Sequence, residues 1–288
     1  MNDKTIVTHN GNFHADDVFS VAALKSIFSS FTLIRTRDLD IIAKADIVID
    51  VGGEYDPEKG RFDHHQRGGA GKRENGIPYS SLGLIWQKYG LEICNGNQDV
   101  ANALDAGLVS TIDAIDCGHV KGVPEGVSLS QTISMFNPTW QEDSHFDTCF
   151  DEAVEFASRV LTRFIAAANG GISAKTIVAS AIQNAQDPRV IVLEKYTPWK
   201  KTVHALSEEA LYMIYPSQTG QWRIQTVPVE PGSFEDKKPL PKEWAGLSDK
   251  ALQEVTGIDD AMFCHNGLFI AGAESFESTM QMASIALK

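Results

Sequence analysis

The feature that most constrains the fold is the alternation of strand and helix patterns near the N-terminus. A β-branched run, Thr5–Thr8, precedes a Gly/Asn/Asp loop, and apolar residues at helical spacing follow it up to Ile27. Residues 31–36 and 47–51 have strand patterns, and residues 39–44 between them have a short helix pattern. Strands that alternate with helices predict right-handed crossovers and a mostly parallel sheet with helices on both faces. The predicted fold class is therefore α/β.

Helical patterns continue along the chain. We predict helices over residues 80–89 with Gly90 as the stop, over 98–116 with Gly118 as the stop, and over 147–168 with a break at Asn169-Gly-Gly171. After Pro188 the pattern changes to short apolar runs separated by Pro- and Gly-rich turns, followed by a final helix over about 275–287. We expect a catalytic domain at 1–146, a helical spacer at 147–186 and a smaller, strand-rich α/β domain at 187–288.

Composition limits the classes of function. The chain has 288 residues and a net charge of -13, from 38 acidic and 25 basic side chains, which suits broad phosphate neutralisation poorly. Clustered carboxylates can instead hold cations, which supply the positive field that a phosphate needs. Four scattered cysteines form no Cys-x-x-Cys pair, and we find neither a targeting segment nor a run of roughly 20 apolar residues. We therefore expect a cytoplasmic protein with free thiols and no membrane partner.

Histidines and aspartates gather where the predicted strands and one helix end. This set comprises His9, His14 and Asp16 after the first strand, Asp50 at the end of the third, Asp63, His64 and His65 after a further extended segment, and Asp113 and Asp116 at a helix end. Ligands of an open α/β sheet bind outside the carboxyl ends of its strands, so these groups are predicted to converge on one crevice.

The donor types indicate the chemistry of this crevice. Imidazoles and carboxylates without thiolate suit Mn²⁺, Mg²⁺ or Fe²⁺, and the set is larger than one ion needs. We therefore expect two divalent metal ions, most simply two Mn²⁺, bridged by one carboxylate and able to hold a phosphoryl group for in-line displacement. Asp50 is the predicted bridge, because it ends a strand directly before Gly52 and Gly53.

The chain resembles the MYG1 family, also called UPF0160, within the DHH phosphoesterase superfamily. The resemblance covers nearly the whole chain and is carried by these segments: Thr8–His14, Asp50–Pro57, Asp63–Arg67, Asn137–Trp140, Pro198–Lys200, Gly220–Gln225, Pro239–Pro241 and His265–Ile270. It implies a DHH-type N-terminal domain and a metal-dependent hydrolase, with 3′→5′ exonuclease activity on RNA.

The resemblance also implies roles for individual residues. His9, His14 and Asp50 look like ligands of the first metal, and Asp16, Asp50, His64 and Asp116 like ligands of the second, with Asp113 in reserve for Asp116. His65 would either face the phosphate or orient the metal ligands, and Asp63 would support the histidines. In the second domain, Arg223, His265 and Gly267 would contact the substrate.

The chain departs from the family pattern where basic residues are expected, in Phe269–Glu277 and in Gly76–Ser81. Arg67, Lys72 and Arg73 follow the His-His pair in a glycine-rich loop that is either a phosphate clamp or simply solvated. The leading prediction is an exonuclease acting on RNA. The alternatives are a phosphatase or phosphodiesterase for small molecules, such as pyrophosphate or short nucleotides, and a metal-holding regulatory protein without turnover. The oligomeric state is left open.

Overall fold

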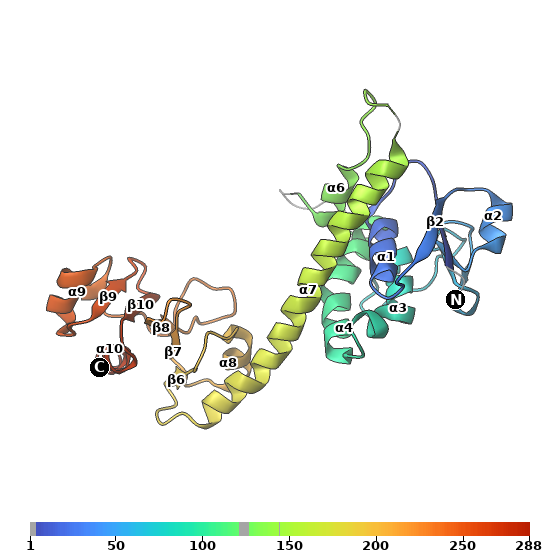
Figure 1. Cartoon of the computed structure of the whole chain (residues 1–288). Coiled ribbons are helices and arrows are strands. Elements are labelled where there is room, and N and C mark those ends of the chain that lie inside the picture. Colours follow the sequence, from blue (N-terminus) through green and yellow to red (C-terminus); the bar gives the residue numbers. More distant parts are fainter. Residues whose placement is uncertain (1–3, 121–126, 144) are drawn as a thin grey trace. The chain divides into compact units, whose positions relative to one another are not determined.

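A computed structural model of the chain describes residues 4–120, 127–143 and 145–288 (Figure 1). The chain divides into two compact units, Met1–Asn169 and Gly170–Lys288. Each unit contains a five-stranded sheet with helices packed against it. The protein is therefore mixed α/β, as its strand and helix patterns predict.

The first unit is built on the predicted N-terminal sheet. Its strands are β1 (Lys4–Thr8), β2 (Phe31–Arg35), β3 (Ile47–Ile49), β4 (Tyr55–Asp56) and β5 (Arg61–Phe62). Their order is β2-β1-β3-β5-β4, and only the β4–β5 pair is antiparallel. The carboxyl ends of β1, β2, β3 and β5 therefore lie along one edge of the sheet, which is where the polar residues of the crevice are expected.

Helices cover this sheet on both sides. Figure 1 shows α2 on one side of the strands and α1 and α3 on the other, and Ile42 of α2 packs with Val7 and Val48 of the sheet. The helical elements of the unit are α1 (Ala15–Lys25), α2 (Leu39–Lys44), η1 (Pro57–Lys59), α3 (Ser81–Ile93), α4 (Gln98–Leu104), η2 (Asp105–Val109), α5 (Ser110–Asp116), α6 (Leu129–Ser134) and the first part of α7 (Phe146–Gln183). The segment η2 is one π-helical stretch that joins α4 to α5.

The second unit has a sheet of order β6-β7-β8-β10-β9, in which only β6 and β7 are parallel. Its elements are β6 (Val190–Val192), α8 (Lys200–Leu206), β7 (Tyr212–Pro216), β8 (Trp222–Thr226), η3 (Lys242–Trp244), α9 (Asp249–Thr256), β9 (Ala261–Cys264), β10 (Ile270–Ala273) and α10 (Phe276–Ala286). Tyr212, Ile214 and Trp244 belong to one buried cluster of this unit, and Ile191, Trp199 and Met213 to another.

The helix boundaries differ from the prediction in ways that packing explains. The helix expected to stop at Gly90 continues to Ile93, whose side chain is buried. Gly90 lies against the Trp86 indole, where a side chain would have little room, so packing rather than a helix end accounts for this glycine. The break expected at Asn169-Gly-Gly171 is wrong, since α7 runs unbroken to Gln183. Glycine costs a helix only about 1 kcal/mol per residue, which packing at both ends of α7 can offset. The short helices α6, α8 and α9 were not predicted.

By length and composition alone, α7 could cross a membrane, which was not expected from the sequence. Its most apolar stretch has a mean hydropathy of 1.2, and 11% of that stretch is buried. One such helix is weak evidence of a membrane segment. Phe150 and Ala157 are buried in the first unit and Ala174 and Val178 in the second, so α7 also supplies core residues. The absence of a membrane partner therefore stays a prediction.

Candidate metal centre

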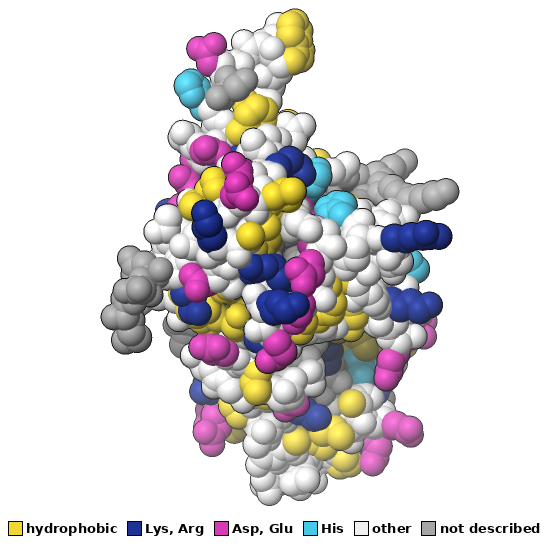
Figure 2. All heavy atoms as spheres, turned by 90° about the vertical axis from the view of Figure 1, so that its right-hand side faces the viewer, with side chains coloured by type: hydrophobic (Ala, Val, Ile, Leu, Met, Phe, Trp, Pro, Cys, Tyr) yellow, Lys and Arg dark blue, Asp and Glu magenta, His cyan; other side chains and the backbone are white. Residues whose placement is uncertain are grey.

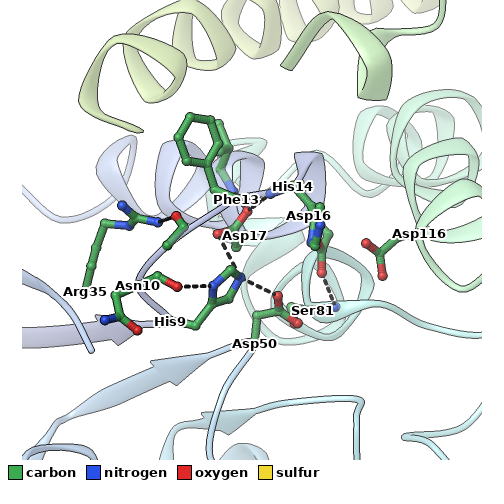
Figure 3. A network of polar contacts seen from close by, with 12 residues as sticks. His9, Asn10, Phe13, His14, Asp16, Asp17, Arg35, Asp50, Ser81 and Asp116 are labelled. Carbon is green, nitrogen blue, oxygen red and sulfur yellow. Dashed lines mark hydrogen bonds and ion pairs between the residues drawn. The ribbon is translucent and has the colours of Figure 1, made fainter. Parts of the chain in front are cut away.

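The loop between β1 and α1 places the first two histidines. His9 directly follows β1, is 3% exposed, and has its Nδ1 3.2 Å from the carbonyl oxygen of Asn10. This contact orients the ring so that Nε2 lies 3.2 Å from Asp50 Oδ2 (Figure 3). His14 stands at the start of α1, and its backbone N–H donates to Asp17 Oδ1 at 2.9 Å. Asp17 thereby caps the helix that also carries Asp16.

Asp50 lies at the centre of the cluster. It follows β3 with a left-handed backbone, φ 58°, which a residue with a side chain adopts at a cost of about 1–3 kcal/mol. A hydrogen bond from its N–H to the carbonyl oxygen of Phe62, 3.1 Å long, holds this conformation. Its Oδ2 faces His9 and its Oδ1 lies 3.2 Å from His64 Nε2. The two oxygens of one carboxylate thus face two different histidines, as a bridging ligand requires.

Three carboxylates surround His64 Nε2. Besides Asp50, Asp116 Oδ2 lies 3.3 Å away and Asp16 Oδ2 3.8 Å away. Asp116 is the last residue of α5, whereas Asp16 comes from the first turn of α1. On the other side of the ring, His64 Nδ1 lies 3.7 Å from Cys117 Sγ.

Burial and mutual repulsion shift the titration of this cluster. Burial and the Asp50 and Asp116 carboxylates raise the pKa of Asp16 well above its ordinary value. Burial also raises the pKa of Asp116, and the charge of Asp50 adds to the effect. Burial works against ionisation of Asp50 as well, but hydrogen bonds from His64 and His9 outweigh it and hold the pKa of Asp50 below its ordinary value.

The residues present fit divalent metal ions. Asp16 is fully buried, and its Oδ1 has no hydrogen-bond partner among the described residues. A buried carboxylate oxygen of this kind needs a cation or a donor. His9, His14 and Asp50 offer donor atoms within 4.8 Å of one another, and so do His14, Asp16 and Asp116, and Asp50, His64 and His65. These groups contain six of the seven residues expected as ligands, and the seventh, Asp113, is in none of them.

Asp63 and His65 lie beside this cluster. Asp63 is 1% exposed, and its Oδ1 lies 2.9 Å from His65 Nδ1. Its Oδ2 accepts the N–H of Gly53 at 2.6 Å. The His65 side chain is 62% exposed. Asp63 therefore holds the ring, as expected of a supporting carboxylate, and leaves Nε2 of His65 for a ligand or substrate.

The structure places Asp113 away from the metal ligands. Its side chain is fully buried and accepts hydrogen bonds from Ser80 Oγ at 2.5 Å, from Gly83 N at 3.1 Å and from Arg73 at 2.6 Å. Burial raises its pKa to about 6. A carboxylate bonded in this way has a structural role, so the geometry favours Asp116 over Asp113 as the ligand.

The same contacts change the expected role of Arg73. Its guanidinium bonds to both Asp105 and Asp113, lies over the Tyr79 ring and is only 8% exposed. Arg73 is thus a structural cation rather than a phosphate clamp. Arg67 and Lys72 are exposed, and among the described residues neither has a side-chain hydrogen bond or ion pair. Lys72 lines a cavity of about 590 Å³ with His64, Tyr79 and Cys117.

The remaining predicted residues belong to the second unit. Arg223 stacks over Phe263, at 5.0 Å from the ring centre, and donates to the carbonyl oxygen of Trp222 at 3.1 Å. His265 follows β9, and its Nδ1 accepts the N–H of Gly267 at 2.9 Å. A substrate role for these three residues stays a prediction.

Four polar residues near the cluster were not predicted. A cavity of about 600 Å³ is lined by Asn10, Asn12 and Arg37 together with His9, His14, Asp50, Asp63 and His65. Arg37 follows β2, so the strand-end rule that found the histidines would also have found it. Ser81 donates to Asp50 Oδ1 at 2.8 Å, and its N–H lies 3.3 Å from Asp16 Oδ2. No sequence pattern distinguishes Ser81 from an ordinary residue at the start of a helix.

Fold and site together define an α/β protein with a buried His/Asp cluster suited to divalent metals. The model of an uncharacterised protein family, UPF0160, matches residues 5–287. Similar full-length proteins are MYG1 exonuclease of Homo sapiens, 34% identical over 100% of this chain and 86% of that protein, and MYG1 exonuclease of Rattus norvegicus, 33% identical over 100% and 85%. MYG1 protein C694.04c of Schizosaccharomyces pombe is 32% identical over 98% and 97%. No solved structure matches. The chain belongs to the MYG1 (UPF0160) family.

Proposed function

We propose that this protein is a metal-dependent exonuclease that hydrolyses phosphodiester bonds at the ends of RNA in the 3′→5′ direction, with two divalent ions. The observation that carries the proposal is the position of Asp50, whose two oxygens each face a different histidine within 3.2 Å. The relatives named exonuclease, which align with the whole chain, support a nuclease. The donor set supports metal dependence.

The positions of the donor atoms support one assignment of the ligands. His9, His14 and Asp50 would hold one ion, and Asp16, Asp50, His64 and Asp116 the other. When bound, such a pair supplies Lewis acidity, an activated water and charge neutralisation for in-line displacement. Asp50 would keep the two sets of ligands at fixed positions relative to each other. Its strained backbone is held by the hydrogen bond to Phe62, and its Oδ1 is held by the hydrogen bond from Ser81. His65, oriented by Asp63, donates a hydrogen bond to the phosphate.

The test is hydrolysis by the purified protein. Labelled RNA, DNA of the same sequence, a dinucleotide and pyrophosphate would each be incubated with Mn²⁺, Mg²⁺, Fe²⁺ or a chelator. We expect 5′-labelled RNA to shorten stepwise in Mn²⁺ and to stay intact with chelator. Intact RNA with every metal would contradict the proposal.

Asp50→Ala tests the bridge and excludes a contaminating nuclease. Removal of the shared carboxylate leaves two cations without the charge between them, so we expect a loss of turnover on the order of 10²-fold or more. The rate of shortening of the labelled RNA measures this loss. A variant with more than about a tenth of wild-type turnover would exclude Asp50 as the bridge.

A small-molecule phosphodiesterase is the second candidate. The net charge of -13 and the engagement of Arg73 with two aspartates favour it, because both leave few cations for a long strand. Equal turnover of a dinucleotide and of long RNA would select this alternative.

A further inference from the structure

The cavity over the candidate metal centre contains a cation that the proposed chemistry does not use. Arg37 lines this cavity of about 600 Å³ together with the histidines and Asp50. The residue is exposed, and no hydrogen bond or ion pair engages its guanidinium among the residues that the structure describes. Arg37 therefore lies beside several carboxylates without an ion pair to any of those described, so its guanidinium is available to bind an anion.

The sheet explains why Arg37 reaches this cavity. Strands β1 and β2 are parallel, with Thr8 opposite Arg35, and the N–H of Thr36 donates to the carbonyl oxygen of Thr8 at 2.8 Å. The chain after β2 is thus fixed beside the loop that carries His9. Arg37 is the next residue after this contact, so its place beside the metal ligands follows from strand pairing.

Arg35, two residues before Arg37, differs from it because its guanidinium is bound within the protein. The Arg35 side chain is 3% exposed and bonds to Asp147 at 2.9 Å and to the carbonyl oxygen of Gly11 at 2.7 Å. Arg35 also lies against the rings of Phe13 and Phe150. It is a structural residue. Arg37, two positions later, has none of these contacts.

Two amides accompany Arg37 in the cavity lining. Asn10 and Asn12 are exposed residues of the loop between His9 and His14. The carboxylates that line this cavity are those of Asp50 and Asp63. Figure 3 shows Asn10 on the opposite side of the His9 ring from Asp50. The cavity therefore has an amide donor on the side of His9 away from Asp50. A guanidinium with amide donors suits a phosphate group, which an arginine binds through two parallel hydrogen bonds.

We propose that Arg37, with Asn10 and Asn12, binds the phosphate that neighbours the scissile one in a nucleic-acid substrate. This inference rests on the proposed exonuclease function. It makes Arg37 a substrate-binding residue that favours chains with at least two phosphates over a single phosphodiester.

The experiment is a double-mutant cycle that combines the removal of the Arg37 side chain with the neutralisation of one phosphate of the substrate. The substrates are a pentaribonucleotide and the same molecule with an uncharged methylphosphonate at the second linkage from the degraded end, which the ladder of the unmodified molecule identifies. For the wild type, we expect neutralisation of this phosphate to lower kcat/KM about tenfold, as for loss of a hydrogen bond to a charged group. Arg37→Ala should lower kcat/KM about tenfold on the charged substrate and by less than about twofold on the neutral one.

Lys44→Ala is the matched control. Lys44 is an exposed cation at the end of α2 that does not line the cavity and has no side-chain partner among the described residues. Its removal changes the net charge equally and should affect both substrates by less than about twofold. Equal losses of Arg37→Ala on both substrates, or the same small effects as Lys44→Ala, would overturn the inference. If the wild type hydrolyses neither substrate nor longer RNA, the proposed function itself fails.

Discussion

The aspartates of the cluster differ in function because their neighbours differ. Asp113 and Asp116 lie on the same short helix, three positions apart, yet Asp113 accepts bonds from Arg73, Ser80 and Gly83, whereas Asp116 faces His64. The first carboxylate is neutralised within the protein. The second is left to repel Asp16 and Asp50, and that repulsion is what a bound cation relieves.

This difference predicts opposite phenotypes for two conservative variants. Asp116→Asn should lower the number of Mn²⁺ ions bound and the activity with little change in Tm, because it removes a ligand. Asp113→Asn should keep the metal content but lower the free energy of unfolding by about 3 kcal/mol, since it breaks a buried pair with Arg73. Titration calorimetry and thermal melts measure the two effects. If only the Asp113→Asn variant lost a bound ion, Asp113 would be the metal ligand and Asp116 the structural residue.

At this scale the sequence predicts residue types better than contacts. The strand-end rule brought His9, Asp50 and His64 together correctly, because parallel strands end at one edge of their sheet. It said nothing about Arg73, whose partners Asp105 and Asp113 lie on other elements. Which donor meets which acceptor depends on tertiary packing, which no local pattern specifies.

At the scale of elements, two glycines occupy helices for different reasons. Gly83 lies in α3 directly against Asp113, where an added Cβ would come within 2.1 Å of Asp113 Oδ2. Gly170 lies in α7, where an added Cβ would meet nothing within 4 Å. The first glycine is required by packing, whereas the second is merely tolerated.

These environments predict opposite effects of the same substitution. Gly170→Ala should stabilise α7 by about 0.5–1 kcal/mol, because alanine has the higher helix propensity and no contact opposes it. Gly83→Ala should destabilise the protein by about 1–3 kcal/mol despite the same propensity gain, since Asp113 must move. Chemical denaturation of both variants gives the comparison. A destabilised Gly170→Ala variant would argue against an unbroken helix at this position.

The continuity of α7 also shows where sequence reasoning about elements fails. Asn169-Gly-Gly171 is a typical stop signal, and the pattern before it ends correctly for an isolated helix. Ala174 and Val178 beyond it are buried in the second unit, and this later burial outweighs the local preference. The strands were more predictable, since β-branched and apolar runs marked β1, β2 and β3, and short apolar runs between Pro- and Gly-rich turns marked the second sheet.

At the scale of the whole molecule, the cluster links metal binding to pH. Burial lowers the pKa of His64, but the hydrogen bonds that its ring makes to Asp50 and Cys117 outweigh it and raise the pKa to about 10. Asp16 also has a raised pKa. Both groups therefore retain protons at a pH where a free ligand would have lost them. A metal ion must displace these protons, so its affinity rises as the pH rises and falls as the pH falls.

We expect Mn²⁺ affinity to increase roughly tenfold per pH unit for each displaced proton between about pH 6 and 8. Calorimetry in buffers of different ionisation enthalpy counts these protons directly. His64→Gln should release fewer protons than the wild type, because its side chain does not titrate. A wild-type affinity that does not change over this range would show that His64 and Asp16 have already lost their protons.

The distribution of charge predicts a shallow dependence of RNA hydrolysis on salt. Figure 2 shows Lys and Arg side chains interspersed with Asp and Glu on the face it draws, and the chain carries a net charge of -13. Arg73 is engaged, which leaves Arg37, Arg67 and Lys72 as free cations near the cluster among the described residues. Neutralisation of roughly two to three phosphates gives a log–log slope of kcat/KM against salt of about -1.4 to -2.1, at about -0.7 per phosphate of a single strand. Arg37→Ala should make this slope shallower by about 0.7, whereas Lys44→Ala should leave it unchanged. A wild-type slope steeper than about -4 would reveal a basic surface that these three residues do not account for.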